Sequence, residues 1–145
     1  MRPVLVLVDI DGTLLLGSPV AHQEALAAAI RDVVGAPVAV ADVVAVDPRG
    51  RVDREILSLV LVRAGVDRAA VPGLLPELAD RADAEHARIV GDHPPQDVAP
   101  GAHAALRDLA ADGLPAAPLT GNLRGIAHRK LHRADLHGHL DLDGG

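Results

Sequence analysis

The chain has 145 residues, a formal net charge of -6 and no cysteine. This length predicts one domain with room for a small insert, and the negative charge argues against nucleic acid or an anionic membrane as the main partner. Without cysteine there is no disulfide bond and no thiol nucleophile. No apolar run reaches the ~20 residues that span a bilayer, and the first apolar run begins at Val4, which leaves no room for a signal peptide. A cytoplasmic protein is therefore expected.

The first expected element is a strand that leads into two carboxylates. The apolar run Val4–Val8 is short and rich in β-branched residues, which is typical of a strand buried on both faces. Asp9 and Asp11 follow at its carboxyl end, the side of an open α/β sheet at which ligands bind. Two carboxylates so close together favour a hard divalent cation between them, and their oxygen atoms suit Mg2+ best. The alternative is a strand that simply ends in an Asp-rich turn.

The following part of the chain predicts helices with no convincing strand between them. Apolar residues recur at helical spacing in 19–34, in 53–64 and in about 72–90. Residues 38–48 are apolar but fit a helix and an extended segment equally well. His93-Pro94-Pro95 then marks a boundary, so that this part reads as a helical insert.

The remainder predicts a helix, a strand and a last helix. The helices are expected over 100–113 and 123–134, and the strand over 114–119. Pro115 and Pro118 argue against the strand because each removes a ladder donor, although its position calls for a second core strand. The order of elements indicates an α/β fold with crossover connections.

Two domains follow from this order of elements. Residues 1–17 and 94–145 are expected to form the α/β core, and residues 18–93 the helical insert.

Residue types that the chain otherwise avoids appear close to the two expected core strands and in the last helix. Thr occurs only at Thr13 and Thr120, Asn only at Asn122 and Lys only at Lys130. We infer that these positions require these particular residue types.

Two motifs together resemble those of the haloacid dehalogenase-like (HAD) hydrolase superfamily. The first is Asp9-x-Asp11-Gly12-Thr13-Leu14, and the second is Thr120-Gly121-Asn122 after the later apolar stretch. The chain is most similar to the phosphoglycolate phosphatase-like members, in which a helical cap follows the first motif, and Gly50-Arg51-Val52-Asp53 resembles a segment of that cap. The resemblance spans nearly the whole chain and implies a Rossmann-like parallel sheet core with a helical cap insert.

The resemblance also implies a function, that of a Mg2+-dependent phosphatase acting on a small phosphorylated metabolite through an aspartyl-phosphate. Asp9 would be the nucleophile that attacks phosphorus, and Asp11 would protonate the leaving oxygen and then activate water. Mg2+ would contact the Asp9 carboxylate and the Asp11 backbone carbonyl. Because dehalogenases of the superfamily lack the second carboxylate, Asp11 favours phosphate transfer over carbon–halogen cleavage. The residues expected to bind phosphate are Gly12, Thr13, Thr120, Gly121, Asn122 and Lys130.

Lys130 has an alternative explanation. On a helix it would lie about 12 Å along the axis from Asn122, which makes contact with the phosphate a long reach. A cation near the end of a helix, favoured by the helix dipole, accounts for it equally well.

The chain departs from the family pattern after the last expected helix. HAD members normally continue with a strand whose acidic residues complete the Mg2+ site, and the printed sequence ends at Gly145 without one. Asp141 and Asp143 are interpreted as surface carboxylates. The core is therefore expected to lack its last strands and to expose an apolar sheet edge that favours a homodimer. The alternative function is a catalytically incomplete domain that only binds phosphate or a phosphoester, or that needs a partner to complete its site.

Overall fold

The computed structural model describes residues 3–143, which separate into two compact units. The first, called the α/β unit, contains the chain up to Ser18, Pro95–Thr120 and the residues from Ala127 onward. The second, called the helical unit, contains Pro19–Pro94 and Gly121–Ile126. Gly121–Ile126 thus belong with the helices rather than with the core segments. The expected division into a core of 1–17 and 94–145 and an insert of 18–93 stays a prediction.

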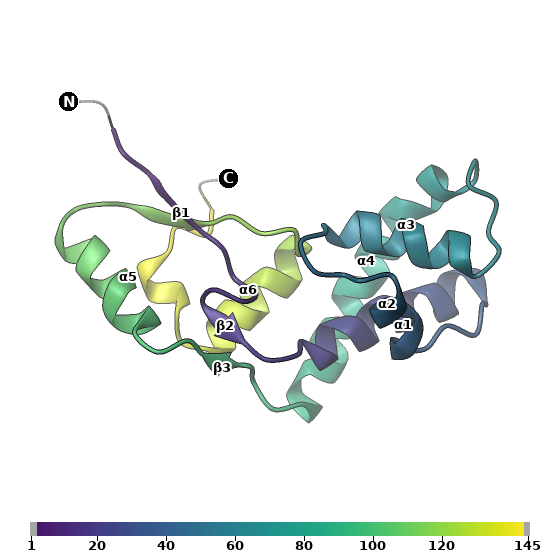
Figure 1. The fold of residues 1–145 in the computed structure, drawn as a ribbon, viewed down its shortest axis with the longest axis horizontal. Helices are drawn as coiled ribbons and strands as arrows, with labels where there is room; N and C mark the ends of the chain where they lie inside the picture. The colour runs from purple at the N-terminus through teal and green to yellow at the C-terminus, as the bar shows by residue number, and fades with distance from the viewer. Residues whose placement is uncertain (1–2, 144–145) are drawn as a thin grey trace. The chain divides into compact units, whose positions relative to one another are not determined.

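A pair of parallel strands forms the basis of the α/β unit. β1 (Val6–Val8) pairs with β4 (Ala116–Pro118) in the register Val6↔Ala116 and Val8↔Pro118. Parallel strands require a long crossover between them, and in this chain the crossover contains the helical insert. The helices of the unit are α5 (Ala102–Ala111), most of α6 (Arg124–Arg133) and the 3-10 helix η2 (His137–His139) (Figure 1). The parallel pairing confirms the expected α/β class.

The core of the α/β unit is made of aliphatic side chains alone, because the chain has no aromatic residue. Its buried members are Ile10, Leu14, Leu15, Ala102, Leu106, Ala116, Ala127, Leu131, Ala134, Leu136 and Leu140. Ile10 and Leu131 are both fully buried in this core. The segment after β1 and one face of α6 therefore pack against the same set of side chains.

β4 forms although Pro118 lies within it and Pro115 just before it, and the hydrogen bonds show why. The Pro115 carbonyl accepts from the Val6 amide at 2.9 Å, and the Leu119 amide donates to the Val8 carbonyl at 2.8 Å. Backbone groups of successive residues point to opposite edges of a strand, so those of Pro115 and Leu119 share the edge that faces β1. Pro118 therefore lacks its N–H on the edge that faces away from β1, where no ladder bond to β1 is lost.

The expectation that β1 is buried on both faces is wrong. Val6 and Val8 pack against the core of the unit, whereas Leu5 and Leu7 are 50% and 54% exposed. Side chains alternate across a strand, so only the face with Val6 and Val8 meets the core. Among the described residues, β1 has β4 as its one partner strand.

Self-association through the exposed side of β1 stays a prediction. We expect light scattering to give a mass that rises above the monomer value with concentration, since Val4, Leu5 and Leu7 place three half-exposed apolar side chains in one segment. The Leu7→Lys variant should then remain monomeric. A monomeric wild-type protein at high concentration would argue against the homodimer.

The sequence patterns did not reveal a second, antiparallel pair of short strands. β2 (Leu15–Leu16) pairs with β3 (Asp97–Val98). Each strand is only two residues long, which is too short for an alternating pattern to be recognised. The pair brings the segment before α5 against the loop that follows β1.

The helical unit contains the three helices expected from periodicity, which are α1 (Val20–Val34), α3 (Asp53–Arg63) and α4 (Val71–Ile89). It also contains α2 (Val40–Ala45) and the 3-10 helix η1 (Val90–Asp92). The ambiguous segment 38–48 is thus helical in part, as α2. No helix among the described residues is long and apolar enough to cross a membrane.

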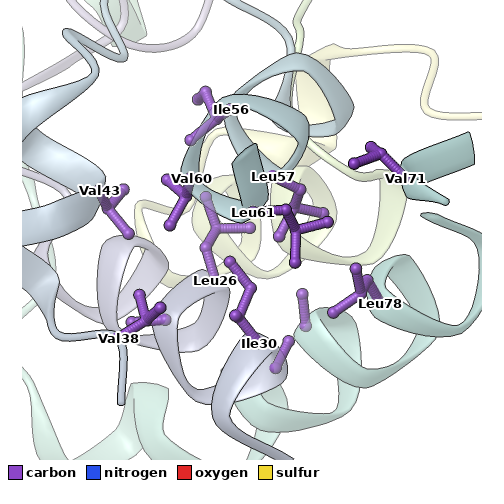
Figure 2. Close-up of a cluster of buried hydrophobic side chains, with 13 residues drawn as sticks. Leu26, Ile30, Val38, Val43, Ile56, Leu57, Val60, Leu61, Val71 and Leu78 are labelled. Carbon is purple, nitrogen blue, oxygen red and sulfur yellow. The ribbon is translucent and has the colours of Figure 1, made fainter. Parts of the chain in front are cut away.

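One apolar cluster holds these helices together. Figure 2 shows Leu26 and Ile30 of α1 facing Leu57 and Leu61 of α3, with Leu78 of α4 beside them. All five are at most 1% exposed. The helical unit therefore has a hydrophobic core of its own, separate from that of the α/β unit.

Candidate active site

The candidate site begins where β1 and β4 end. Because the two strands are parallel and the Leu119 amide bonds to the Val8 carbonyl, the residues that follow them leave the sheet at the same edge. Asp9 is the residue after β1, and Thr120 follows Leu119. The α/β unit thus places a carboxylate and a hydroxyl at the carboxyl end of its sheet.

A tight loop after β1 fixes the two carboxylates. The carbonyl of Ile10 accepts from the amides of Thr13, Leu14 and Leu15 at 3.2, 2.9 and 3.0 Å. Gly12 takes φ +82°, a left-handed conformation that favours glycine. Since Ile10 is completely buried, the loop is anchored in the core between Asp9 and Asp11.

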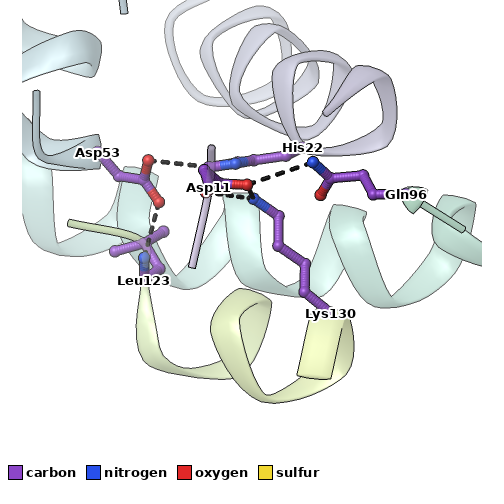
Figure 3. Close-up of polar contacts among 6 residues, drawn as sticks. All are labelled: Asp11, His22, Asp53, Gln96, Leu123 and Lys130. Carbon is purple, nitrogen blue, oxygen red and sulfur yellow. Dashed lines mark hydrogen bonds and ion pairs between the residues drawn. The ribbon is translucent and has the colours of Figure 1, made fainter. Parts of the chain in front are cut away.

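The two carboxylates have different surroundings. Asp9 is exposed, and its Oδ2 accepts a hydrogen bond from the Thr13 hydroxyl at 3.0 Å. Asp11 is half-buried, and both of its carboxylate oxygens lie 2.9 Å from Nζ of Lys130 (Figure 3). Environment can give two neighbouring carboxylates distinct chemical roles.

Lys130 is almost entirely buried, with its side chain 5% exposed. A buried ammonium is costly unless it is paired and hydrogen-bonded, and the Asp11 carboxylate supplies that partner. Lys130 therefore does more than complement the helix dipole, because it reaches from α6 to the loop of residues 9–14 that carries Asp9 and Asp11, called the acidic loop. Its expected contact with phosphate stays a prediction.

Gln96 also contacts Asp11, and sequence reasoning missed it. Its Nε2 lies 3.4 Å from Oδ1 of Asp11, a long hydrogen bond. Gln96 immediately precedes β3, so the unrecognised pairing of β2 with β3 is what brings it to the loop. Nothing in the residue type or its neighbours pointed to this contact.

A second polar cluster lies within the helical unit and is centred on Asp53, the first residue of α3. The carboxylate is buried, with Oδ1 at 2.8 Å from Nε2 of His22 and Oδ2 accepting from the Leu123 amide at 2.7 Å (Figure 3). The Asp53 amide donates to the Gly121 carbonyl at 2.8 Å. The start of α3 thus holds the segment that leads into α6.

A glycine is required at position 121 because the backbone there lies close to that of Arg51 and Val52. A Cβ built there would lie 2.8 Å from Cα of Val52 and 2.9 Å from the carbonyl oxygen of Arg51. Both are backbone atoms, which cannot rotate away. The glycine of the second motif therefore has a packing reason within the helical unit.

Comparison with known proteins identifies the family. A family model of haloacid dehalogenase-like hydrolases matches residues 4–144, nearly the whole chain. The chain belongs to the haloacid dehalogenase-like hydrolase family. The resemblance inferred from the two motifs is thereby confirmed at the level of the family. No curated protein matches the chain.

Solved structures that resemble this HAD-like hydrolase include a proposed beta-phosphoglucomutase from Thermotoga maritima. The two are 22% identical with a TM-score of 0.50, over 95% of this chain and 59% of that chain. A dehalogenase structure is 16% identical with a TM-score of 0.40, over 96% of this chain and 60% of that chain. The chain thus spans about three fifths of the length of these structures. At such identity the first likeness shows the fold alone, in agreement with the expected Rossmann-like core.

The expected site residues of this HAD-like hydrolase fall in both units. Asp9, Asp11, Gly12, Thr13, Thr120 and Lys130 belong to the α/β unit, and Gly121 and Asn122 to the helical unit. Within the α/β unit the structure joins Asp11 to Lys130 and Asp9 to Thr13.

The amides of Gly12 and Thr13 bond inside the loop, to the carbonyls of Leu15 and Ile10. Their role as phosphate ligands, like that of Thr120, Gly121 and Asn122, stays a prediction. These two bonds stabilise the acidic loop, and a phosphate that used the Gly12 amide would have to replace one of them.

Proposed function

We propose that the protein is a Mg2+-dependent phosphatase that hydrolyses a small phosphorylated metabolite through an aspartyl-phosphate. The observation that carries the proposal is the contrast between two carboxylates on one anchored loop. Asp9 is exposed and contacts a hydroxyl, whereas Asp11 is held through both oxygens by the Lys130 ammonium. The Asp9 carboxylate is therefore accessible to a substrate, and the Asp11 carboxylate has a fixed orientation.

Asp9 is the nucleophile in this proposal. An oxygen of its carboxylate attacks phosphorus and the bond from phosphorus to the leaving oxygen breaks. Asp11, which has to enter this step in its protonated form, gives its proton to that oxygen and is left as the carboxylate that pairs with Lys130. The Thr13 hydroxyl, bonded to Oδ2 at 3.0 Å, restricts the rotation of the Asp9 carboxylate. Restricted rotation favours catalysis because less entropy is lost on reaching the reactive geometry.

Asp11 serves both steps of the reaction. After the leaving group departs, water attacks the phosphorus of the aspartyl-phosphate, the bond to Asp9 breaks, and Asp11 accepts the proton of the water. Phosphate leaves and both carboxylates return to their first state. Lys130 and Gln96 hold the Asp11 side chain in place throughout.

The oxygen atoms of the loop fit Mg2+. The Asp9 carboxylate is exposed, and carboxylate and carbonyl oxygens are the ligands that this ion prefers. Asp9 and the Asp11 backbone carbonyl would hold it, with water and substrate oxygens as the other ligands. Bound Mg2+ supplies charge neutralisation between the carboxylate and the phosphate.

The alternative, a domain that only binds phosphate or a phosphoester, is favoured by one observation. Nowhere in residues 3–143 do three or more His, Cys, Asp or Glu side chains gather so that they could hold a metal ion. A site with so few protein ligands would depend on the substrate for Mg2+ affinity.

Hydrolysis of p-nitrophenyl phosphate by the purified chain tests the proposal. We expect release of p-nitrophenol with Mg2+ and its loss when EDTA removes the ion. Binding of inorganic phosphate without any turnover would contradict the phosphatase and support the binding domain.

Lys130→Met removes the ammonium but keeps a side chain of similar length. If Lys130 orients Asp11, kcat should fall about 100-fold while KM changes little, because the substrate loses no contact. A large rise in KM with kcat preserved would show instead that Lys130 binds the phosphate. Arg107→Met, which removes an exposed cation of α5, is the matched control and should leave both constants unchanged.

A further inference from the structure

We infer that Asp53 of the helical unit is a positioning residue for the segment Gly121–Leu123, and that it sets the phosphate affinity of this segment. The inference rests on the proposed function and on the prediction from the second motif that Gly121 and Asn122 contact the phosphate. Asp53 itself touches no substrate in this account. It acts through the backbone that it holds.

Asp53 contacts the segment at both ends. Its amide donates to the Gly121 carbonyl at 2.8 Å, and its Oδ2 accepts from the Leu123 amide at 2.7 Å. Two bonds from one residue span Asn122 and fix the peptide planes on either side of it. Phosphate binding by backbone amides depends on the direction of those planes.

Both oxygens of the Asp53 carboxylate have hydrogen-bond partners within the helical unit. The side chain is 1% exposed, and its second oxygen lies 2.8 Å from Nε2 of His22. A buried carboxylate is costly unless its oxygens are hydrogen-bonded. His22 and the Leu123 amide together meet that requirement, and His22 is itself 6% exposed.

His22 is in turn fixed by its surroundings. Its ring packs edge-on against that of His86 of α4, with centroids 6.4 Å apart and the planes at 85°. α1, α3 and α4 therefore all contribute to the position of Asp53. Gly121 and Leu123 are thus held by a residue of α3 whose own position depends on α1 and α4.

The same contacts decide which amides are open to a ligand. The Leu123 amide already donates to Asp53, so a phosphate cannot use it without displacing a carboxylate. The Leu123 amide is accordingly not among the expected phosphate ligands, which are Thr120, Gly121 and Asn122. The helical unit thus both shapes the segment and limits its ligand contacts.

The test compares variants of Asp53 for amide exchange, for inorganic phosphate binding and for turnover of p-nitrophenyl phosphate. Asp53→Ala should speed hydrogen exchange of the amides in 121–123, weaken phosphate binding about tenfold and raise KM, with a smaller change in kcat. Asp53→Asn keeps an acceptor of the same shape for the Leu123 amide and should restore affinity to within about threefold of wild type. If Asp53→Ala does not fold, Asp53→Ser replaces it, because a hydroxyl is too short to reach Leu123.

Glu85→Ala is the matched control, since Glu85 is also a buried carboxylate of the helical unit and is paired with Arg88 instead. It should lower stability without changing phosphate affinity. Wild-type exchange at 121–123 or wild-type phosphate affinity in a folded Asp53→Ala would overturn the inference. A wild-type chain that binds no phosphate would overturn the proposed function, and the exchange of 121–123 in Asp53→Ala would still decide whether Asp53 holds the segment.

Discussion

We expect Asp9→Asn to lower kcat for p-nitrophenyl phosphate by at least about 1,000-fold, because an amide is a far weaker nucleophile than a carboxylate. The substitution keeps the shape of the side chain and an oxygen that can accept from the Thr13 hydroxyl. Asp9 is also exposed, so no buried contact is lost. The variant should therefore fold like the wild type, and steady-state kinetics at saturating Mg2+ measure the effect.

Asp108→Asn provides the control for this experiment. Asp108 is an exposed carboxylate of α5 in the same unit, so its loss changes the net charge equally. Its kcat should match that of the wild type. If Asp9→Asn keeps wild-type turnover, Asp9 is not the nucleophile and the proposed mechanism is wrong.

The second large effect is expected from Gly121→Ala. The new Cβ would lie within 3.0 Å of three atoms of Arg51 and Val52, of which the Val52 Cα and the Arg51 carbonyl oxygen belong to the backbone. Forcing these segments apart strains the contact that also carries the bond from the Asp53 amide to the Gly121 carbonyl. Overpacking of this kind costs about 1–3 kcal/mol, and urea denaturation measures the loss of unfolding free energy.

Gly125→Ala distinguishes backbone crowding from the loss of a glycine as such. A Cβ at Gly125 would also meet close atoms, but they belong to the side chain of Asp83, which can change its rotamer at the cost of its present contacts, whereas a backbone cannot. Gly125 lies in α6, where alanine is favoured by about 1 kcal/mol. We expect a smaller loss of stability for Gly125→Ala than for Gly121→Ala, and equal destabilisation by both variants would count against the role of the Arg51–Val52 backbone.

Much of the fold could be predicted because its signals are local. α3 begins at Asp53 and α4 runs over Val71–Ile89, close to the ends that helical spacing indicated. The strand before Asp9 and the parallel strand before Thr120 also lie where the apolar runs placed them. Each of these features depends on neighbours within one element.

Features that depend on distant residues could not be predicted. Whether β1 is covered on both faces depends on what packs there, which an apolar run does not reveal, and Leu7 proves half-exposed. Lys130 meets Asp11 across 119 residues of chain, and Leu123 meets Asp53 across 70. The lone lysine marked Lys130 as unusual, yet its partner follows only from the packing of α6 on the acidic loop.

Chemical trapping of the aspartyl-phosphate is the most direct test of Asp9 as the nucleophile. Excess enzyme is mixed with p-nitrophenyl phosphate and Mg2+, quenched in acid and digested, and the peptides are analysed by mass spectrometry. We expect a phosphoryl group on Asp9 in the wild type and none at this position in Asp9→Asn. Turnover with no phosphoryl group on Asp9, or with the group on another residue, would contradict it.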